Sequence, residues 1–228
     1  TLLVLAGGFG TRLKTAVSEV PKPLAPVCGE PFLKHLIKNC ISQGAADFCF
    51  LIFHEAEKIE SMLSEMKKNN DLKGIKVRCV LEDKPLGTGG ALLNAINELN
   101  LKESFLAINA DTWLGTGLQL INKAKAPALA TVKVENTQRY GNLRVNSNLV
   151  QQFEEKNSTK GEGLINAGLY HLLPESFSGI SVGSSFSLEK EVLPQLAKEN
   201  SLYAVDLNTD FIDIGIPEDY YRFCNWLS

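Results

Sequence analysis

The sequence predicts one α/β domain over residues 1–228, built on a mixed, mostly parallel sheet with helices on both faces. Short apolar runs alternate with amphipathic segments through the first half of the chain. The apolar runs lack polar alternation, as expected of strands that are buried on both sides of a parallel sheet. A length of 228 residues with 44% hydrophobic residues is sufficient for one complete core.

In the first part, about residues 1–126, strands and helices alternate. Apolar runs predict strands at 2–5, 48–53, 75–81 and 105–108. Helical spacing of apolar residues predicts helices at 31–43, 55–68 and 91–99. In parallel sheets, ligands bind beyond the carboxyl ends of the strands. The glycines after Leu5, together with Glu82 and Asp111, follow such ends, so we expect them to lie together.

From about residue 127 the pattern changes to strand-like segments with few helices between them. Strands are expected at 128–134, 142–145, 150–153, 165–171, 202–207 and 211–214. A helix is expected at 188–198, and Pro217 begins a last one. This pattern predicts that residues 127–228 form an antiparallel or mixed extension, which adds a second wall to the site. No linker or internal repeat divides the chain.

The first strand leads directly into a glycine-rich turn that contains Gly7, Gly8 and Gly10, followed by Thr11 and Arg12. Glycines let a ligand approach the backbone, and successive amides can form a concavity for anions. The guanidinium of Arg12 suits phosphate oxygens. These features indicate a phosphate site, although GGFGTR alone could be a strand-to-helix turn with an incidental arginine.

Lys22 lies between two prolines, in the segment PKPLAPV, on what we expect to be a surface loop. The proline after it restricts its backbone to extended conformations, which favours a fixed position for its charge. Two known phosphate motifs are excluded. The chain has no G-x-x-x-x-G-K-[ST] motif, and Leu13 stands where a dinucleotide fingerprint has its third glycine.

Composition excludes several other classes of protein. A net charge of −3 argues against a nucleic-acid partner. No apolar run is long enough for a membrane span, and no secretory signal is visible, so we expect no membrane partner and a cytoplasmic protein. The five cysteines show no C-x-x-C spacing, which favours buried thiols over a zinc site.

Two aspartates are candidate metal ligands. Asp111 follows an apolar strand, and Asp213 lies within the apolar run FIDIG. A carboxylate in such a place is costly to bury unless it is paired or binds a metal. Two carboxylates with waters and a nucleoside triphosphate suit Mg²⁺. The alternative for Asp111 is the N-cap of a following helix.

Taken together, GGFGTR and PKPLAPV resemble the signature of the sugar-nucleotide pyrophosphorylases, a family of nucleotidyltransferases, and the resemblance covers essentially the entire chain. It implies the nucleotide-diphospho-sugar transferase fold, which is Rossmann-like and GT-A-like. Residues 1–126 would then bind the nucleotide and residues 127–228 the sugar. The implied reaction joins a nucleoside triphosphate and a sugar 1-phosphate to give a nucleotide-sugar and pyrophosphate.

The resemblance also implies roles for individual residues. Arg12 and Lys22 would be catalytic, and Mg²⁺ on Asp111 and Asp213 would be the cofactor. The segment E-D-K-P-L-G-T-G-G resembles the family's base pocket, where its glycines could otherwise form only a strand-to-helix turn. The nucleotide would be bound by Leu5, Ala6, Gly7, Gly8, Gly10, Thr11, Glu82, Gly87 and Thr88. The sugar phosphate would be bound by Asn109, Gly141, Glu155, Lys156 and Asn166. Without the resemblance, the segment Glu154-Glu155-Lys156 would be interpreted as a charged stretch exposed to solvent.

Several longer strings, among them PLGTGGAL, SLEKEVLP and FIDIGIPEDY, look most like the D-glycero-D-manno-heptose 1-phosphate guanylyltransferases. Mannose-1-phosphate guanylyltransferases and N-acetylmuramate-1-phosphate uridylyltransferases share much of this pattern. A non-catalytic sugar-nucleotide-binding regulatory subunit is the alternative from another class. A glycosyltransferase is disfavoured, because the chain contains no D-x-D motif. The resemblance leaves a homo-oligomer open. We expect GTP to be the nucleotide, because the carboxylate of Glu82 can accept hydrogen bonds from both donors on the edge of guanine.

Overall fold

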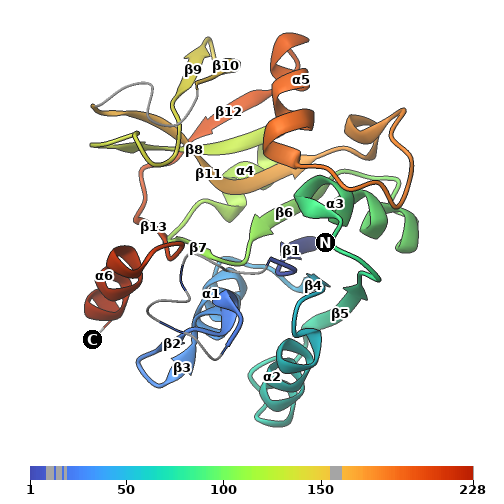
Figure 1. Cartoon of the computed structure of the whole chain (residues 1–228), viewed down its shortest axis with the longest axis vertical. Helices are drawn as coiled ribbons and strands as arrows, with labels where there is room; N and C mark the ends of the chain where they lie inside the picture. Colours follow the sequence, from blue (N-terminus) through green and yellow to red (C-terminus); the bar gives the residue numbers. More distant parts are fainter. Residues whose placement is uncertain (9–12, 14–16, 18–19, 155–160, 228) are drawn as a thin grey trace.

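The structure is a computed structural model that describes residues 1–8, 13, 17, 20–154 and 161–227. Its centre is a nine-stranded sheet in the order β5-β4-β1-β6-β11-β8-β12-β10-β9 (Figure 1). The strands are β1 (Leu2–Leu5), β4 (Asp47–Ile52), β5 (Lys76–Leu81), β6 (Phe105–Asn109), β8 (Ala128–Val134), β9 (Leu143–Asn146), β10 (Leu149–Phe153), β11 (Gly163–Leu172) and β12 (Tyr203–Asp206).

The sheet is mixed, as predicted. Strands β5, β4, β1 and β6 are parallel to one another. Strand β11 is antiparallel to both β6 and β8, so the sheet continues without a break from the first part of the chain into the extension. Two short ladders lie outside it, β2 (Pro26–Val27) with β3 (Glu30–Pro31), and β7 (Thr112–Leu114) with β13 (Phe211–Asp213).

Helices cover both faces of the sheet and enclose a separate core on each (Figure 1). One core contains side chains of α1 (Phe32–Ser42), α2 (Ala56–Lys68), α4 (Leu118–Lys123) and α6 (Pro217–Leu227). The other contains side chains of α3 (Gly87–Glu98), α5 (Leu193–Lys198) and the helical turns η3 (Pro174–Phe177) and η4 (Leu188–Val192). The α/β architecture with two-sided helical cover is therefore confirmed. No helix in the described part of the chain has the length and apolar character needed to cross a bilayer.

The predicted elements are present with boundaries shifted by a few residues. The main difference is α3, which begins at Gly87 and not at Ala91, so the glycines 87, 89 and 90 form its first turn. The β2–β3 hairpin, β7 and α4 were not predicted, because they have only two to six residues and offer too little periodicity to detect.

Candidate active site

The carboxyl ends of β1, β5 and β6 meet at one edge of the sheet, as predicted. Leu5 at the end of β1 pairs with Asn109 at the end of β6. A Cβ added to Gly7 would lie 3.1 Å from Oε1 of Glu82 and 3.3 Å from the Cβ of Phe53. Glycine is therefore required at position 7 by the close approach of these strand ends.

The rest of the predicted phosphate turn is only partly described. Leu5 is half-buried, Ala6 is buried and Gly8 is exposed. A Cβ added to Gly8 would have no described atom within 4 Å, so the backbone there is open to a ligand. The predicted contributions of Gly10, Thr11 and Arg12 concern residues that lie outside the described part of the chain.

Lys22 lies beside both predicted metal ligands. Its Nζ is 2.5 Å from Oδ2 of Asp111 and 3.4 Å from Oδ1 of Asp213. The expectation that Lys22 lies on an open surface loop was wrong. It begins the 3₁₀ helix η2 (Lys22–Leu24), and its side chain is only 9% exposed because it points inward to the two carboxylates.

The pairing of β7 with β13 brings the two aspartates together. Asp213 is the register partner of Thr112, which directly follows Asp111. The backbone N–H of Ile214 also donates to the carbonyl of Asp111 at 3.0 Å. The N-cap alternative for Asp111 is wrong, since Asp111 is followed by a strand and not by a helix.

Gly215 completes the site and was not identified from the sequence. Its N–H donates to Oδ1 of Asp213 at 2.7 Å. A Cβ at this position would lie 2.7 Å from the same oxygen and 3.0 Å from Nζ of Lys22. The sequence feature that could have identified it is a glycine two residues after Asp213. The absence of a side chain there leaves room for the carboxylate of Asp213 and the ammonium of Lys22.

The electrostatics of the site oppose ionisation of Asp213. Burial and the neighbouring charge of Asp111 raise its pKa above the ordinary value of 3.8. The ammonium of Lys22 and the N–H of Gly215 act in the opposite direction but do not cancel the shift. A further positive charge beside Asp213 would therefore favour its ionised form.

The two aspartates fit a divalent cation, because they converge on a point that already holds the positive charge of Lys22. In the described residues there is no group of three or more His, Cys, Asp or Glu side chains that could form a complete metal cage. Mg²⁺ is commonly held by one or two carboxylates plus substrate phosphates and waters. The pair suits such a shared site.

Glu82 points inward and not to solvent. It is 6% exposed, and its Oε2 accepts a hydrogen bond from the N–H of Leu86 at 2.9 Å. Burial raises the pKa of Glu82, and the bond from Leu86 partly offsets this. Its carboxylate therefore lies directly beside Gly7 of the phosphate turn, as a nucleotide-binding role requires.

The glycines after Glu82 pack against the segment before η4. The N–H groups of Gly89 and Gly90 both donate to the carbonyl of Phe186, at 3.0 and 3.3 Å. These two amides of the predicted base-pocket segment are therefore already bound within the protein. The hydroxyl of Thr88 donates to Oε2 of Glu189 at 2.6 Å and accepts from the N–H of Leu188 at 2.9 Å. Glu189 was missed because Glu-Lys-Glu is typical of a solvated helix face.

We expect Gly87→Ala to destabilise the protein more than Gly74→Ala. Both glycines have positive φ, +70° and +77°. The two substitutions therefore share a backbone cost of roughly 1–2 kcal/mol. A Cβ at Gly87 would also lie 2.6 Å from the carbonyl oxygen of Phe186, whereas one at Gly74 would meet no described atom within 4 Å. Overpacking should add about 1–3 kcal/mol at Gly87, measurable by urea unfolding. Equal costs would show that the helix start can shift away from Phe186.

On the sugar side, Asn166 and Asn109 meet at the hydroxyl of Tyr170. Nδ2 of Asn166 donates to this hydroxyl at 3.0 Å, and Oδ1 accepts from the N–H of Gly168 at 3.0 Å. Burial and the charge of Glu189 raise the pKa of Tyr170 well above 10, and its hydrogen bonds with the two asparagines oppose the shift. Oδ1 of Asn109 is buried and has no hydrogen-bond partner among the described residues.

The other predicted sugar-site residues lie in the extension. Gly141 has φ +79° and closes a turn at residues 137–141. Glu155 and Lys156 lie outside the described residues. Glu154 precedes them and accepts hydrogen bonds from Nδ2 of Asn142 at 3.0 Å and from Nε of Arg144 at 2.5 Å. Each of its two carboxylate oxygens therefore has a partner within the protein.

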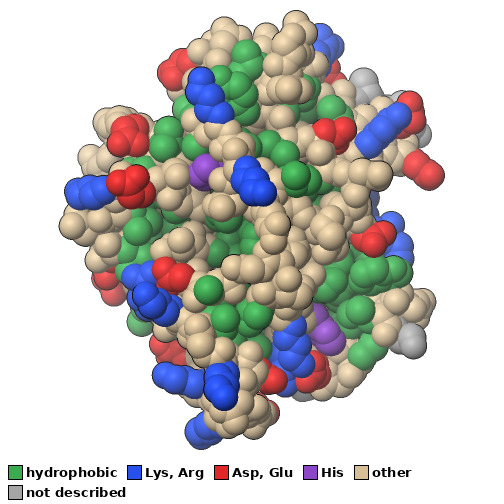
Figure 2. All heavy atoms as spheres, turned by 180° about the vertical axis from the view of Figure 1, so that it is seen from behind, with side chains coloured by type: hydrophobic (Ala, Val, Ile, Leu, Met, Phe, Trp, Pro, Cys, Tyr) green, Lys and Arg blue, Asp and Glu red, His purple; other side chains and the backbone are tan. Residues whose placement is uncertain are grey.

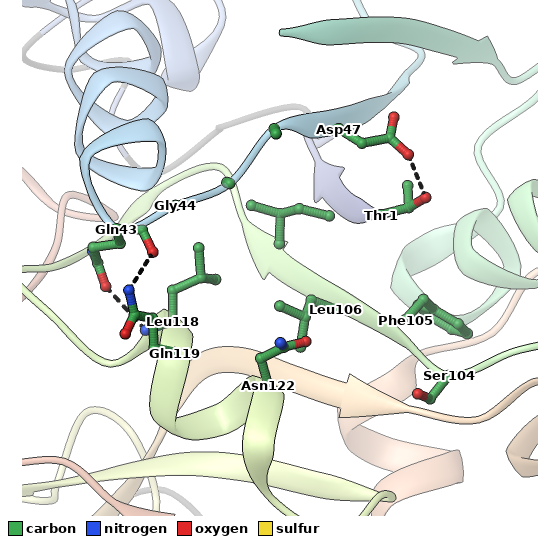
Figure 3. A pocket seen from close by; sticks show the side chains of 13 residues that line it. Thr1, Gln43, Gly44, Asp47, Ser104, Phe105, Leu106, Leu118, Gln119 and Asn122 are labelled. Carbon is green, nitrogen blue, oxygen red and sulfur yellow. Dashed lines mark hydrogen bonds between the residues drawn. The ribbon is translucent and has the colours of Figure 1, made fainter.

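A separate cavity of about 350 Å³ lies at the opposite edge of the sheet, near the amino ends of β1, β4 and β6 (Figure 3). Its acidic residue, Asp47, accepts from the hydroxyl of Thr1 at 2.6 Å and from Arg78 at 3.0 Å. Gln119 at its side donates to the backbone carbonyl of Gln43 at 3.2 Å. Lys22 and its two aspartates are not among the residues that line it. This cavity is therefore not the candidate active site.

The face of the molecule drawn in Figure 2 carries interspersed basic and acidic side chains. Such a mixed surface agrees with the net charge of −3 and differs from the basic stripe of a nucleic-acid-binding protein.

Comparisons with known proteins identify the family. The family described as nucleotidyl transferase matches residues 1–227. D-glycero-alpha-D-manno-heptose 1-phosphate guanylyltransferase of Campylobacter jejuni is 34% identical over 97% of both chains. Its counterpart in Aneurinibacillus thermoaerophilus is 33% identical over 96% of this chain and 95% of its own. Mannose-1-phosphate guanyltransferase beta-A of Xenopus laevis is 31% identical over 99% of this chain, which spans 64% of that protein.

Solved structures show the same fold over the whole chain. HddC from Yersinia pseudotuberculosis has a TM-score of 0.86 and 32% identity, with 100% of this chain and 99% of that chain covered. The same protein in complex with GMP-PN has a TM-score of 0.84. The inositol-1-phosphate CTP transferase from T. maritima, at 18% identity and a TM-score of 0.78, covers 98% of this chain and 94% of its own and shares the fold alone.

The match over residues 1–227 covers nearly the entire chain, and two relatives above 30% identity cover it from end to end. With its carboxylates and Lys22 at the edge of a mixed α/β sheet, the chain belongs to the nucleotidyl transferase family.

Proposed function

We propose that the protein transfers GMP from GTP to D-glycero-D-manno-heptose 1-phosphate, which gives GDP-heptose and pyrophosphate. The observation that carries this proposal is the convergence of Asp111, Asp213 and Lys22 beside a glycine turn that suits phosphate. Guanylyltransferases for this sugar are 34% and 33% identical to the chain. The compartment we propose is the cytoplasm, on the grounds of the sequence.

In this reaction an oxygen of the sugar phosphate attacks the α-phosphorus of the nucleotide in line, and pyrophosphate leaves. Both reactants are strongly anionic, so the protein contributes mainly positioning and charge neutralisation. Lys22 is held by its backbone within η2 and supplies a positive charge beside the α-phosphate. The open backbone at Gly8 would receive the triphosphate together with Arg12, and Asn109, Asn166 and Lys156 would receive the sugar phosphate.

Asp111 and Asp213 would hold Mg²⁺, which when bound supplies neutralisation of the triphosphate charge. The ammonium of Lys22 now occupies the space between these carboxylates. The ammonium of Lys22 would add a second positive charge beside the one that a bound cation supplies. Gly215 is needed in either state, because any side chain at that position would collide with Asp213.

A mannose-1-phosphate guanylyltransferase is the second candidate, since relatives with that activity are 31% and 32% identical to the chain. A pyrophosphate-release assay of GTP, UTP, dTTP and ATP against heptose, mannose, glucose and muramate 1-phosphates tests both. We expect the highest kcat/KM for GTP with the heptose. Higher kcat/KM with mannose would select the second candidate, and highest activity with UTP and muramate would select a uridylyltransferase. Binding of these compounds without turnover would support a regulatory subunit.

We expect Glu82→Gln to lower the preference for GTP over UTP by about tenfold. Guanine presents two adjacent donors, which a carboxylate can accept, whereas uracil presents one donor between two acceptors. Glutamine can keep the bond from Leu86 but places an amide N–H₂ group where the second oxygen stood. A buried donor facing a donor costs ~1–3 kcal/mol, enough for this change.

The measurement is competition of GTP against UTP at sub-saturating concentrations. Asp83→Asn, which changes the exposed carboxylate next in the chain, is the matched control and should keep the wild-type preference. If Glu82→Gln slows the reaction with GTP and with UTP equally, Glu82 does not select the base. Its role would then be to accept the hydrogen bond from the backbone N–H of Leu86. A wild-type preference for UTP would remove the guanine assignment.

A further inference from the structure

A buried carboxylate outside the predicted site links two distant segments of the chain. Asp219, in the first turn of α6, is 5% exposed. Its Oδ2 accepts hydrogen bonds from Nη1 of Arg139 and, at 3.4 Å, from the hydroxyl of Tyr140. Its Oδ1 lies 3.3 Å from Nη2 of Arg222 on the same helix. A buried charge must be paired, and Asp219 finds two of its partners about 80 residues earlier in the chain.

Arg139 and Tyr140 belong to the 137–141 turn, which also carries Gly141. The amides of Tyr140 and Gly141 donate to the carbonyl of Thr137 at 2.9 and 3.0 Å. The amide of Thr137 in turn donates to the carbonyl of Gly161 at 3.1 Å. The turn is therefore fixed to Gly161 on one side and to Asp219 on the other.

The same turn packs against the strand that carries Asp213. The guanidinium of Arg139 lies 5.1 Å from the centre of the Tyr140 ring, and that ring meets Phe211 edge-on with 5.6 Å between centres. Phe211 precedes Asp213 by two residues on β13. Burial, together with the charges of Asp219 and Asp213, raises the pKa of Tyr140 to about 12. The cluster thus lies within the electrostatic field of the predicted metal ligand.

We infer that Asp219 is a positioning residue for the sugar 1-phosphate, which acts through Arg139 and Tyr140 to hold the 137–141 turn against the strand of Asp213. This inference rests on the proposed function. The turn carries Gly141, predicted to contact the sugar, and β13 carries Asp213, predicted to bind the metal. Asp219 binds the turn from α6, and the ring of Tyr140 packs on Phe211 of β13. A misplacement of about 1 Å between reacting groups can cost about 10²-fold in rate, so this link affects function beyond its contribution to stability.

The test compares Arg139→Gln with Arg222→Gln. Each variant removes one positive partner of Asp219, but Arg222 pairs with it within α6, three residues away, whereas Arg139 belongs to the turn itself. Arg139 is 39% exposed, so its truncation opens no core cavity. We expect Arg139→Gln to raise the KM for the sugar 1-phosphate by about tenfold, with the KM for GTP within about twofold of the wild type. Arg222→Gln should leave both KM values unchanged, and Arg139→Lys should restore part of the loss.

We expect the double variant Arg139→Gln with Asp219→Asn to have a KM for the sugar 1-phosphate no higher than that of the more impaired single variant. Both substitutions break the same link between α6 and the 137–141 turn, so their effects should not add. If Arg139→Gln changed the KM for the sugar 1-phosphate and the KM for GTP equally, the inference would be overturned. The same holds if Arg222→Gln had as large an effect as Arg139→Gln. Asp219 would then form a general structural ion pair. Unchanged KM values for Arg139→Gln would overturn the inference as well.

A second measurement does not depend on activity. Hydrogen exchange of the amides of Tyr140 and Gly141 should be faster in Arg139→Gln than in Arg222→Gln, without any substrate. If the wild type shows no turnover with any sugar 1-phosphate while exchange follows this expectation, the proposed function fails and the link between α6 and the turn stands. If exchange is equal in the two variants, Asp219 does not hold the turn and the inference fails, whatever the activity.

Discussion

Lys22→Met should lower kcat by about 10²–10³-fold, the cost of removing one preorganised charge from a site of developing negative charge. Methionine keeps the length of a side chain that is only 9% exposed, so little packing is lost. The ammonium that now lies 2.5 Å from Asp111 and 3.4 Å from Asp213 disappears. Steady-state kinetics with saturating GTP and sugar 1-phosphate measure the effect.

Lys34→Met is the matched control. Lys34 in α1 is likewise mostly buried, with 14% exposure, but its described ion pairs are with Glu30 of β3 at 2.7 Å and Asp71 at 3.6 Å, outside the candidate site. We expect its kcat to equal that of the wild type. A Lys22→Met enzyme with near-normal kcat would exclude Lys22 from the chemical step and leave it as a counter-ion for the two aspartates. The same assay applied to Arg12→Ala tests the prediction made for that residue from the sequence.

Asp111→Asn and Asp213→Asn should each raise the Mg²⁺ concentration needed for half-maximal activity by at least about 10–100-fold. Loss of a group that only supports a metal ligand typically has this effect, and loss of a ligand should have no less. Asparagine keeps the shape and one carbonyl oxygen but loses the anion that a hard cation prefers. A Mg²⁺ titration of initial rates measures it. An unchanged titration for either variant would show that the aspartate concerned does not bind the metal.

The stability of Asp213→Asn should change in the opposite direction to its activity. The pKa of Asp213 is raised in the folded protein, so the folded state holds this proton more tightly than the unfolded state does. The free energy of unfolding therefore falls as pH rises from 3.8 through the raised value. Asparagine carries no charge, so at pH 7 the variant should resist urea at least as well as the wild type. A clearly less stable variant would show that the ionised carboxylate is a net stabilising partner of Lys22.

Most of the framework could be predicted from the sequence, because it depends on local periodicity. The apolar runs at residues 2–5 and 105–108 are too uniformly hydrophobic to be anything but strands buried on both faces, and they occur as β1 and β6. The parallel arrangement of these strands and of the strand before Glu82 predicts that the glycines after Leu5, Glu82 and Asp111 lie at one edge of the sheet. The β7–β13 ladder escaped prediction, because a strand of three residues has almost no pattern of its own.

The candidate site was predicted as a set of residues, but only the tertiary structure decided how they meet. Lys22 and Asp213 are 191 residues apart, and no local pattern states that one points at the other. The segment of residues 82–90 was expected to line a base pocket, but only the fold shows that the amides of Gly89 and Gly90 are bound to the carbonyl of Phe186. Asp219 lies in the first turn of α6, and only the fold brings Arg139, 80 residues earlier in the chain, against its carboxylate.

The sequence by itself determined the α/β class, the edge of the sheet where we expect the ligands to bind and the chemical types of the groups gathered there. These follow from the period of apolar residues and from the few residue types that suit phosphate and Mg²⁺. The tertiary structure alone decided which charges are paired, which amides are already used and that Lys22 is buried. The physical reason is that burial and hydrogen bonding of each polar group depend on segments distant in the chain, and these become neighbours only when the sheet is assembled.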